Sequence, residues 1–260
     1  MPLMTKYDQG TPSWVDLDTP DPADASRFYS ELFGWTIAEG RPEAGGHRMC
    51  MLDDQAVAGL GTQMSADTSP SWMTYISVAN ADEMAAAIKE DGGSILVEPM
   101  DVLDVGRMAV AADPGGAVFS VWQPRAHAGA GLVNDPNTWC WNELTTRDPQ
   151  HSVEFYGAVF GWTATLLPTA GPDGYTEFHV ADRGIAGMMP VVGDAWPADM
   201  PNHWMVYFAV DDCDAAVAKV EALDGEVIMA PKDVPPGTFA VVKDPQGAVF
   251  SVIAMRPAAA

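Results

Sequence analysis

The stretch WVDLDTPDPADASRFYSELFGW, from Trp14 to Trp35, occurs again as WNELTTRDPQHSVEFYGAVFGW, from Trp141 to Trp162. The two copies align without a gap over 22 positions at an offset of 127 residues (141 minus 14), and 10 positions are identical. Near the end of each half, DPGGAVFSV (113–121) matches DPQGAVFSV (244–252) at 8 of 9 positions. Such self-similarity indicates an internal duplication.

Each copy of the first stretch predicts a helix. Asp21-Pro22 and Asp148-Pro149 supply an N-cap residue followed by proline in the first turn, where proline is favoured. Gly34 and Gly161 stand where helices commonly end in a left-handed residue. Between these signals the apolar residues recur at a spacing of three and four, so they form one face that packs on a sheet.

Alternating apolar and polar residues before and after each helix predict strands, and the resulting unit is βαβββ. The unit recurs more weakly later in each half, with helices expected at 82–90 and 212–223. Four such units account for nearly the whole chain and predict an α+β fold. Because paired units of this kind curl their sheets into half-open barrels, we expect one cleft in each half.

The boundary between the halves is expected in PRAHAGAGLVNDPN (124–137), which is rich in Pro, Gly, Ala and Asn and has no hydrophobic periodicity. The predicted domains are therefore 1–127 and 128–260. Each pair of units leaves apolar surface that its duplicate can cover, so the halves should pack as a pseudo-dimer within one chain. The chain itself is then expected to be a monomer or a homodimer.

The composition limits the possible partners. With 260 residues, 48% of them hydrophobic, the chain can bury a sizeable core. The 13 basic and 36 acidic residues give a net charge of −23, which argues against nucleic acid and membrane partners. The sequence has neither an apolar run long enough to span a membrane nor a signal peptide pattern, so we expect a cytoplasmic protein. Cys50, Cys140 and Cys213 form no disulfide or zinc pattern.

The FYxxxFGW pattern of residues 28–35 and 155–162, together with the DPxGAVFSV turn, resembles the vicinal oxygen chelate superfamily, which includes glyoxalase I, bleomycin-resistance proteins and extradiol dioxygenases. The resemblance extends from about Trp14 to Ile253 and implies two tandem glyoxalase-like half-open barrels. Within the superfamily, the duplicated layout is most similar to tandem glyoxalase-like proteins of actinobacteria, some of which are named hydroxylases. Because the superfamily contains enzymes and pure binding proteins, the resemblance implies a fold more than an activity.

Metal-using members of this superfamily hold a divalent ion with His and Glu side chains from four strands. Matching the motifs puts those positions at Trp14, Gly59, Met73 and Ser120 in the first half and at Trp141, Gly187, Met205 and Ser251 in the second. None of these is a His or a carboxylate, so we expect no metal. A shift of two residues leaves one alternative, a non-standard site of the second half made from Glu143, Glu177, His179 and His203. No Walker loop or dinucleotide motif is present, and no cofactor is expected.

The same positions instead predict aromatic and thioether-rich pockets for a flat or hydrophobic molecule. The expected ligand-binding residues are Trp14, Met73, Tyr75, Arg107, Ser120, Trp122, Trp141, His203, Met205, Tyr207 and Ser251. Asp16 and Glu143 hold matching positions, where burial would raise the pKa of a carboxyl toward the range of a general base. Arg107 is expected to hold a carboxylate or enolate in the first cleft. His47, His127 and His151 are expected to be solvated.

The sequence therefore favours a protein of the glyoxalase/bleomycin-resistance type that binds a hydrophobic or aromatic metabolite in metal-free clefts. It would serve for sequestration or as an auxiliary biosynthetic enzyme. The alternative is a metal-dependent glyoxalase I-like lyase or extradiol-type dioxygenase with one degenerate half. A signalling or interaction protein with vestigial clefts is a third hypothesis.

Overall fold

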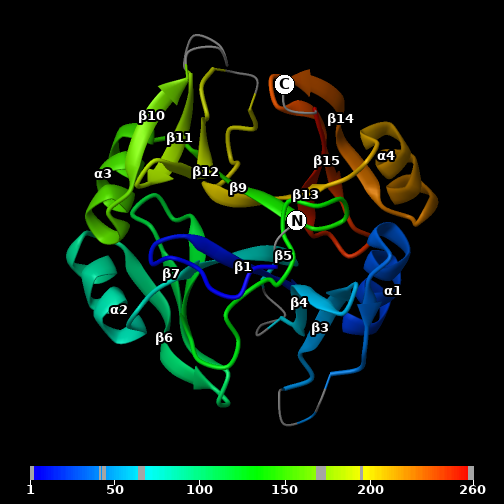
Figure 1. The fold of residues 1–260 in the computed structure, drawn as a ribbon. Coiled ribbons are helices and arrows are strands. Elements are labelled where there is room, and N and C mark those ends of the chain that lie inside the picture. Colours follow the sequence, from blue (N-terminus) through cyan, green and yellow to red (C-terminus); the bar gives the residue numbers. More distant parts are fainter. Residues whose placement is uncertain are drawn as a thin grey trace.

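The computed structural model describes residues 3–40, 42, 45–63, 68–167, 174–193 and 196–256. In these ranges each half builds one eight-stranded sheet of its own (Figure 1). The first sheet has the order β2-β3-β4-β1-β5-β8-β7-β6 and the second has the matching order β10-β11-β12-β9-β13-β16-β15-β14. The predicted α+β fold of four βαβββ units in two tandem barrels is thus confirmed.

The elements follow the repeat. The first sheet consists of β1 (Pro12–Thr19), β2 (Thr36–Ile37), β3 (Arg48–Leu52), β4 (Gln55–Thr62), β5 (Ser71–Ser77), β6 (Ser94–Val102), β7 (Gly106–Ala112) and β8 (Val118–Pro124). The second consists of β9 (Trp139–Thr146), β10 (Thr163–Leu167), β11 (Tyr175–Val180), β12 (Arg183–Pro190), β13 (His203–Ala209), β14 (Glu226–Val234), β15 (Gly237–Lys243) and β16 (Val249–Met255). The helices are α1 (Pro22–Phe33), α2 (Ala81–Glu90), α3 (Pro149–Phe160) and α4 (Cys213–Ala222).

The predicted caps of the first helix in each half are confirmed. The side chain of Asp21 accepts hydrogen bonds from the backbone N–H groups of Ala23 and Asp24, and Gly34 closes α1 in the left-handed conformation with φ of 75°. In α3, Asp148 accepts from the N–H of His151, and Gly161 closes the helix with φ of 71°. None of the helices in the described ranges is long and apolar enough to cross a membrane.

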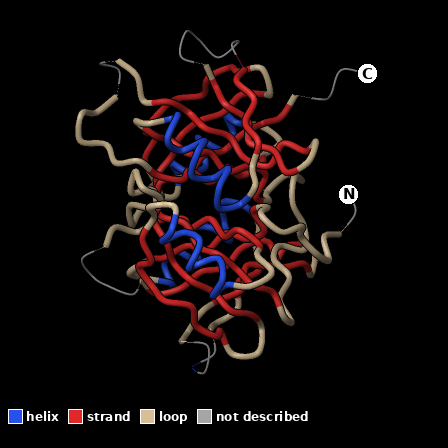
Figure 2. Tube along the Cα trace, turned by 90° about the vertical axis from the view of Figure 1, so that its left-hand side faces the viewer, coloured by secondary structure: helices blue, strands red, loops and turns tan. Residues whose placement is uncertain are grey.

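The helices pair across the two halves rather than within them. Figure 1 shows α1 beside α4 on one side of the molecule and α2 beside α3 on the other, and Figure 2, which faces one of these sides, shows a pair of helices stacked one above the other. The apolar faces of α1 and α4 join one core cluster, and those of α2 and α3 join another. The expected pseudo-dimer within one chain is therefore present, because each half supplies apolar surface that covers the other.

Two matched groups of hydrogen bonds tie the halves together. The hydroxyl of Tyr29 donates to Oδ2 of Asp244 over 3.0 Å and accepts from Nε1 of Trp72 over 3.0 Å. In the other direction, the hydroxyl of Tyr156 donates to Oδ2 of Asp113 over 3.1 Å and accepts from Nε1 of Trp204 over 2.9 Å. The FYxxxFGW motif of one half thus binds the DPxG turn of the other, which explains why these two motifs are the best repeated parts of the sequence.

The connection at 125–138 packs against the first half. The backbone N–H of Ala130 donates to the carbonyl oxygen of Ser13 over 2.9 Å, and that of Gly131 donates to Ala56 over 2.7 Å. The hydroxyl of Tyr7 also reaches the carbonyl oxygen of Ala130 over 2.7 Å. This contact makes the two halves unequal, because the linker covers a part of the first sheet.

Candidate functional site

Strand register gathers the predicted site residues other than Arg107 on one face of each sheet, opposite the helices. In the first half, Trp14 lies opposite Tyr75, Asp16 opposite Met73, and Tyr75 opposite Ser120. Residues opposite each other in neighbouring strands point to the same face. Trp122 joins this face two residues after Ser120, and its ring centroid lies 6.4 Å from that of Tyr75. We call this set the first-half face; its members are Trp14, Asp16, Met73, Tyr75, Ser120 and Trp122.

The second half repeats this arrangement. Trp141 lies opposite Tyr207, Glu143 opposite Met205, and Tyr207 opposite Ser251. His203 extends the same face toward the start of β13, where it pairs with Thr145. The register therefore brings together every predicted ligand-binding residue of the second half. We call this set, with Glu143 and Tyr175, the second-half face.

A half-buried acid, Glu143, lies at the centre of the second-half face. The hydroxyl of Tyr207 donates to Oε1 of Glu143 over 2.9 Å, and the hydroxyl of Tyr175 also hydrogen-bonds this carboxyl. Nε1 of Trp141 in turn donates to the hydroxyl of Tyr175 over 2.9 Å. Burial raises the pKa of Glu143 above its ordinary value, and the two tyrosine donors only partly oppose this. The raised pKa moves this carboxyl toward the range in which a side chain can both give and take a proton.

The matching acid of the first half is Asp16, and its pKa is shifted in the opposite direction. Oδ1 of Asp16 accepts from Nε1 of Trp14 over 2.9 Å and lies 3.0 Å from Nε2 of His47. Burial alone would raise the pKa of Asp16, but His47, Trp14 and Tyr75 outweigh it and hold the pKa below its ordinary value. The expected upward shift is therefore wrong for Asp16, because the sequence did not reveal its histidine partner.

His47 and Tyr175, which contact Asp16 and Glu143 respectively, were not predicted as site residues. His47 directly precedes β3 and Tyr175 begins β11, so they hold matching places in the repeat. Each reaches its acid across a glycine of the neighbouring strand. A Cβ atom at Gly59 would overlap the carboxylate of Asp16, and one at Gly187 would overlap the hydroxyl of Tyr175. The duplication could have revealed them, because His47 and Tyr175 occupy matching positions of the repeat, at or immediately before the start of the strand that precedes the one with Gly59 or Gly187.

The expectation that His127 is solvated is also wrong. Its ring packs edge-on against Trp14, with centroids 4.5 Å apart, and its carbonyl oxygen accepts from Nε1 of Trp122 over 2.8 Å. Burial accordingly lowers the pKa of His127. As a result Trp14 is only 4% exposed, whereas its counterpart Trp141 is half-buried. The expectation holds for His151, which is exposed on α3.

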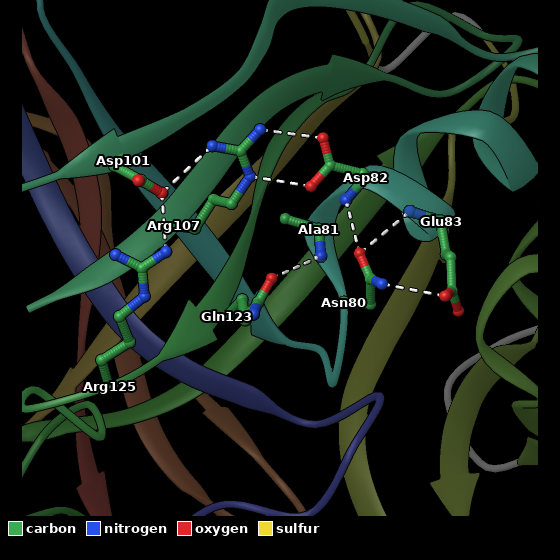
Figure 3. Close-up of polar contacts among 8 residues, drawn as sticks. All are labelled: Asn80, Ala81, Asp82, Glu83, Asp101, Arg107, Gln123 and Arg125. Carbon is green, nitrogen blue, oxygen red and sulfur yellow. Dashed lines mark hydrogen bonds and ion pairs between the residues drawn. The ribbon is translucent and has the colours of Figure 1, made fainter.

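Arg107 does not lie on the first-half face. Its Nε and Nη2 each lie 2.8 Å from a carboxylate oxygen of Asp82, and its Nη1 lies 3.0 Å from Asp101 (Figure 3). On the neighbouring strand Arg107 pairs with Gln123, whose side chain accepts from the backbone N–H of Ala81 at the start of α2. This register points Arg107 to the helix side of the sheet, so its predicted role in binding a carboxylate or enolate is wrong.

The donor groups of the described residues do not suit a divalent metal. In those ranges no group of three or more His, Cys, Asp or Glu side chains is placed so that it could hold an ion. Nε2 of His179 pairs instead with Oε1 of Glu177 over 3.0 Å, and Nδ1 of His203 lies 2.9 Å from the carbonyl oxygen of Pro201. The non-standard site considered for Glu143 and these three residues is therefore not assembled.

Two hollows lie outside both faces. One of about 250 Å³ lies between α3 and the strands β10 to β12, where Val153, Leu166 and Met188 line it. The other, of about 100 Å³, lies where the turn at Asp113 meets the start of α3. Neither is lined by a predicted site residue. Trp141 and Glu143, which are half-buried on the second-half face, line neither hollow.

The raised pKa of Glu143 predicts that the stability of the fold depends on pH. Because its pKa is raised in the folded state above the ordinary 4.5, the folded protein holds this proton more tightly than the unfolded chain. The associated stability is present at low pH and is lost as the pH rises through the raised value. Glu143→Gln lacks this loss, so its Tm relative to the wild type should be higher at about pH 8 than at about pH 5. Thermal melts at both pH values check this, with Glu221→Gln on α4 as the control, and an equal difference at both would contradict it.

The comparisons with known proteins agree with this architecture. The family model "Glyoxalase/Bleomycin resistance protein/Dioxygenase superfamily" matches residues 11–121 and 140–252. CFP32 of Mycobacterium tuberculosis, whose name suggests a glyoxylase, is 41% identical over 265 residues that cover 99% of each chain. DnrV of Streptomyces peucetius, named an anthracycline biosynthesis protein, is 37% identical over 280 residues that cover 99% of this chain and 98% of DnrV.

Among solved structures, the Mn(II)-bound glyoxalase of Novosphingobium aromaticivorans has a similar fold, with a TM-score of 0.65 and 15% identity, over 95% of this chain and 83% of its own. Both halves of the chain match the family model, and the two relatives match over 99% and 98% of their length. The chain therefore belongs to the glyoxalase/bleomycin resistance protein/dioxygenase superfamily.

Proposed function

We propose that the chain binds a flat aromatic or hydrophobic molecule on the second-half face without a metal ion, and that Glu143 exchanges a proton with it. Such a protein serves to sequester the molecule or acts as an auxiliary enzyme of its biosynthesis. The observation that carries the proposal is the position of Glu143, a half-buried carboxyl of raised pKa held by two tyrosine hydroxyls beside Trp141.

The surroundings of Glu143 support an aromatic ligand. Trp141 offers a rigid ring that is half-buried, and Met205 adds a side chain that adapts to irregular shapes. Tyr207 is held in place by its bond to Glu143 and by packing against Phe239, with ring centroids 6.0 Å apart. The name of DnrV points in the same direction, since anthracyclines are flat polycyclic aromatics and DnrV matches this chain over nearly its whole length.

A metal-dependent lyase or dioxygenase has less support. It needs several His or carboxylate ligands around one ion, and the described residues present no such group. The resemblance to metal-using members of the superfamily predicts ligands at Trp141, Gly187, Met205 and Ser251, and none of these is a His or a carboxylate. We therefore propose no reaction step through a metal.

The test is binding in the presence of a chelator. Quinizarin, a dihydroxyanthraquinone, is flat, aromatic and coloured, and its binding is followed by quenching of tryptophan fluorescence. We expect the protein to bind quinizarin with the same Kd before and after treatment with EDTA, and with one site of high affinity per chain, because His127 covers the first-half face. Binding that disappears in EDTA and returns on adding one divalent ion would refute the proposal.

A further inference from the structure

Asp16 and His47 form an isolated acid–base pair in the first half. Oδ1 of Asp16 lies 3.0 Å from Nε2 of His47, and it also accepts from Nε1 of Trp14. Gly59 provides the space for this contact, because a Cβ atom there would overlap the carboxylate and come within 2.6 Å of Nε2 of His47. The pair takes the place that Glu143 and Tyr175 hold in the second half, but its chemistry is different.

The hydrogen bonds decide which nitrogen of His47 carries a proton. Since the pKa of Asp16 is held below its ordinary value, this carboxyl is ionised at neutral pH and only accepts hydrogen bonds. Nε2 of His47 must therefore be the donor to Asp16. In the neutral imidazole the lone pair is then on Nδ1, which is the arrangement that a general base requires.

We propose that the first half is an acid–base site of its own, in which His47, oriented by Asp16, takes the hydroxyl proton of a small phenol or enol. In this step the ligand O–H bond breaks, its oxygen keeps the electron pair, and Nδ1 of His47 forms the new N–H bond. Asp16 remains ionised and stabilises the imidazolium that results. His47 is thus the catalytic residue, and Asp16 is a positioning residue.

The shape of the first half limits the size of the ligand. The ring of His127 covers Trp14, and its carbonyl oxygen holds the indole of Trp122, so the aromatic face is closed to a polycyclic molecule. The side chain of His47 remains 34% exposed. A ligand therefore meets His47 at the rim of the sheet, where a single ring or a short enol fits better than a stacked polycycle.

The charges around His47 favour a neutral ligand that brings a proton. The titratable groups near it are Asp16 and Asp18 on β1, Tyr75 on β5 and His127 in the linker. Asp16 above all raises the pKa of His47, which makes it a stronger base than an ordinary histidine. Burial raises the pKa of Asp18 to about 6, so a second carboxylate faces the site at neutral pH and repels anions. A neutral phenol or enol satisfies both conditions.

The probe for this site is fluorophenol, whose fluorine NMR signal reports the ionisation of its hydroxyl. With the wild-type chain, the bound phenol should lose its proton at a lower pH than the free phenol. His47→Gln should abolish this shift, while His151→Gln, which removes an exposed histidine of α3, should leave it intact. An undiminished shift in His47→Gln would overturn the proposal, and so would a wild-type chain that does not bind fluorophenol.

The positioning role of Asp16 has a separate readout in the titration of the His47 ring by NMR. In the wild type this ring should titrate above its ordinary value of 6.5, and in Asp16→Asn its pKa should fall. If Asp16→Asn does not fold, the wild-type titration alone decides, since a His47 that titrates at or below 6.5 contradicts the pairing. The outcome is independent of quinizarin binding, because that test probes the second-half face.

Discussion

Replacing Asp244 by Ala should lower the free energy of unfolding by about 3 to 5 kcal/mol, because four hydrogen-bond donors, two of them buried, lose their acceptor together. Asp244 is 2% exposed, and its Oδ1 accepts from the backbone N–H groups of Gln246, Gly247 and Ala248 over 2.8 to 2.9 Å. Its Oδ2 accepts from Tyr29, which is fully buried in the other half. Urea unfolding at neutral pH measures the loss.

Two controls distinguish the effect of losing this contact between the halves from the effect of losing a negative charge. Glu221→Ala removes an exposed acid from α4 and should change stability by less than about 0.5 kcal/mol. Tyr29→Phe combined with Asp244→Ala should cost less than the sum of the two single changes, since the residues share one hydrogen bond. A loss below about 1 kcal/mol in Asp244→Ala would show that the halves are not joined through this turn.

Replacing Trp141 by Ala should weaken quinizarin binding by about tenfold to a hundredfold, which corresponds to about 1 to 3 kcal/mol. The reason is that Trp141 is the half-buried ring of the second-half face, and its Nε1 also positions Tyr175 next to Glu143. Fluorescence titration and calorimetry with the purified variant measure the change in Kd.

The matched control is Trp14→Phe in the first half. This change keeps an aromatic ring against His127 and removes only the hydrogen bond to Asp16. Because His127 covers Trp14, we expect the affinity for quinizarin to stay within about twofold of the wild type, a difference of less than about 0.5 kcal/mol. An equal loss in both variants would mean that the dye binds on both faces, and no loss in Trp141→Ala would place the ligand elsewhere.

The parts of the fold that follow from local chemistry could be predicted from the sequence. The caps at Asp21 and Gly34 are local signals, and the duplication extended them to the second half. Strand alternation was sufficient to place Trp141, Met205 and Tyr207 on one face of the sheet, because every second residue of a strand points to the same face. The pairing of helices across the halves was expected only in outline, as apolar surface that a duplicate could cover.

The errors arose where a side chain depends on contacts far away in the sequence. Arg107 was placed on the wrong face because β7 lacks a clear alternation, and only its pairing with Gln123 settles the phase. His47 and His127 lie in connecting segments, whose course over the sheet no local pattern determines. The pKa shift of Asp16 was predicted in the wrong direction for the same reason, since this pKa depends on His47.

The most direct test of the proposed function is a pH titration of the visible absorption of bound quinizarin, in the wild type and in Glu143→Gln. If Glu143 exchanges a proton with the ligand, the wild-type complex should show an absorption step at a pH above the ordinary 4.5 of a glutamate, and Glu143→Gln should bind the dye without this step. Tyr207→Phe should move the step to higher pH, since Tyr207 donates a hydrogen bond that favours the ionised carboxyl. The same step in wild type and Glu143→Gln would contradict the role of Glu143 as the group that exchanges the proton.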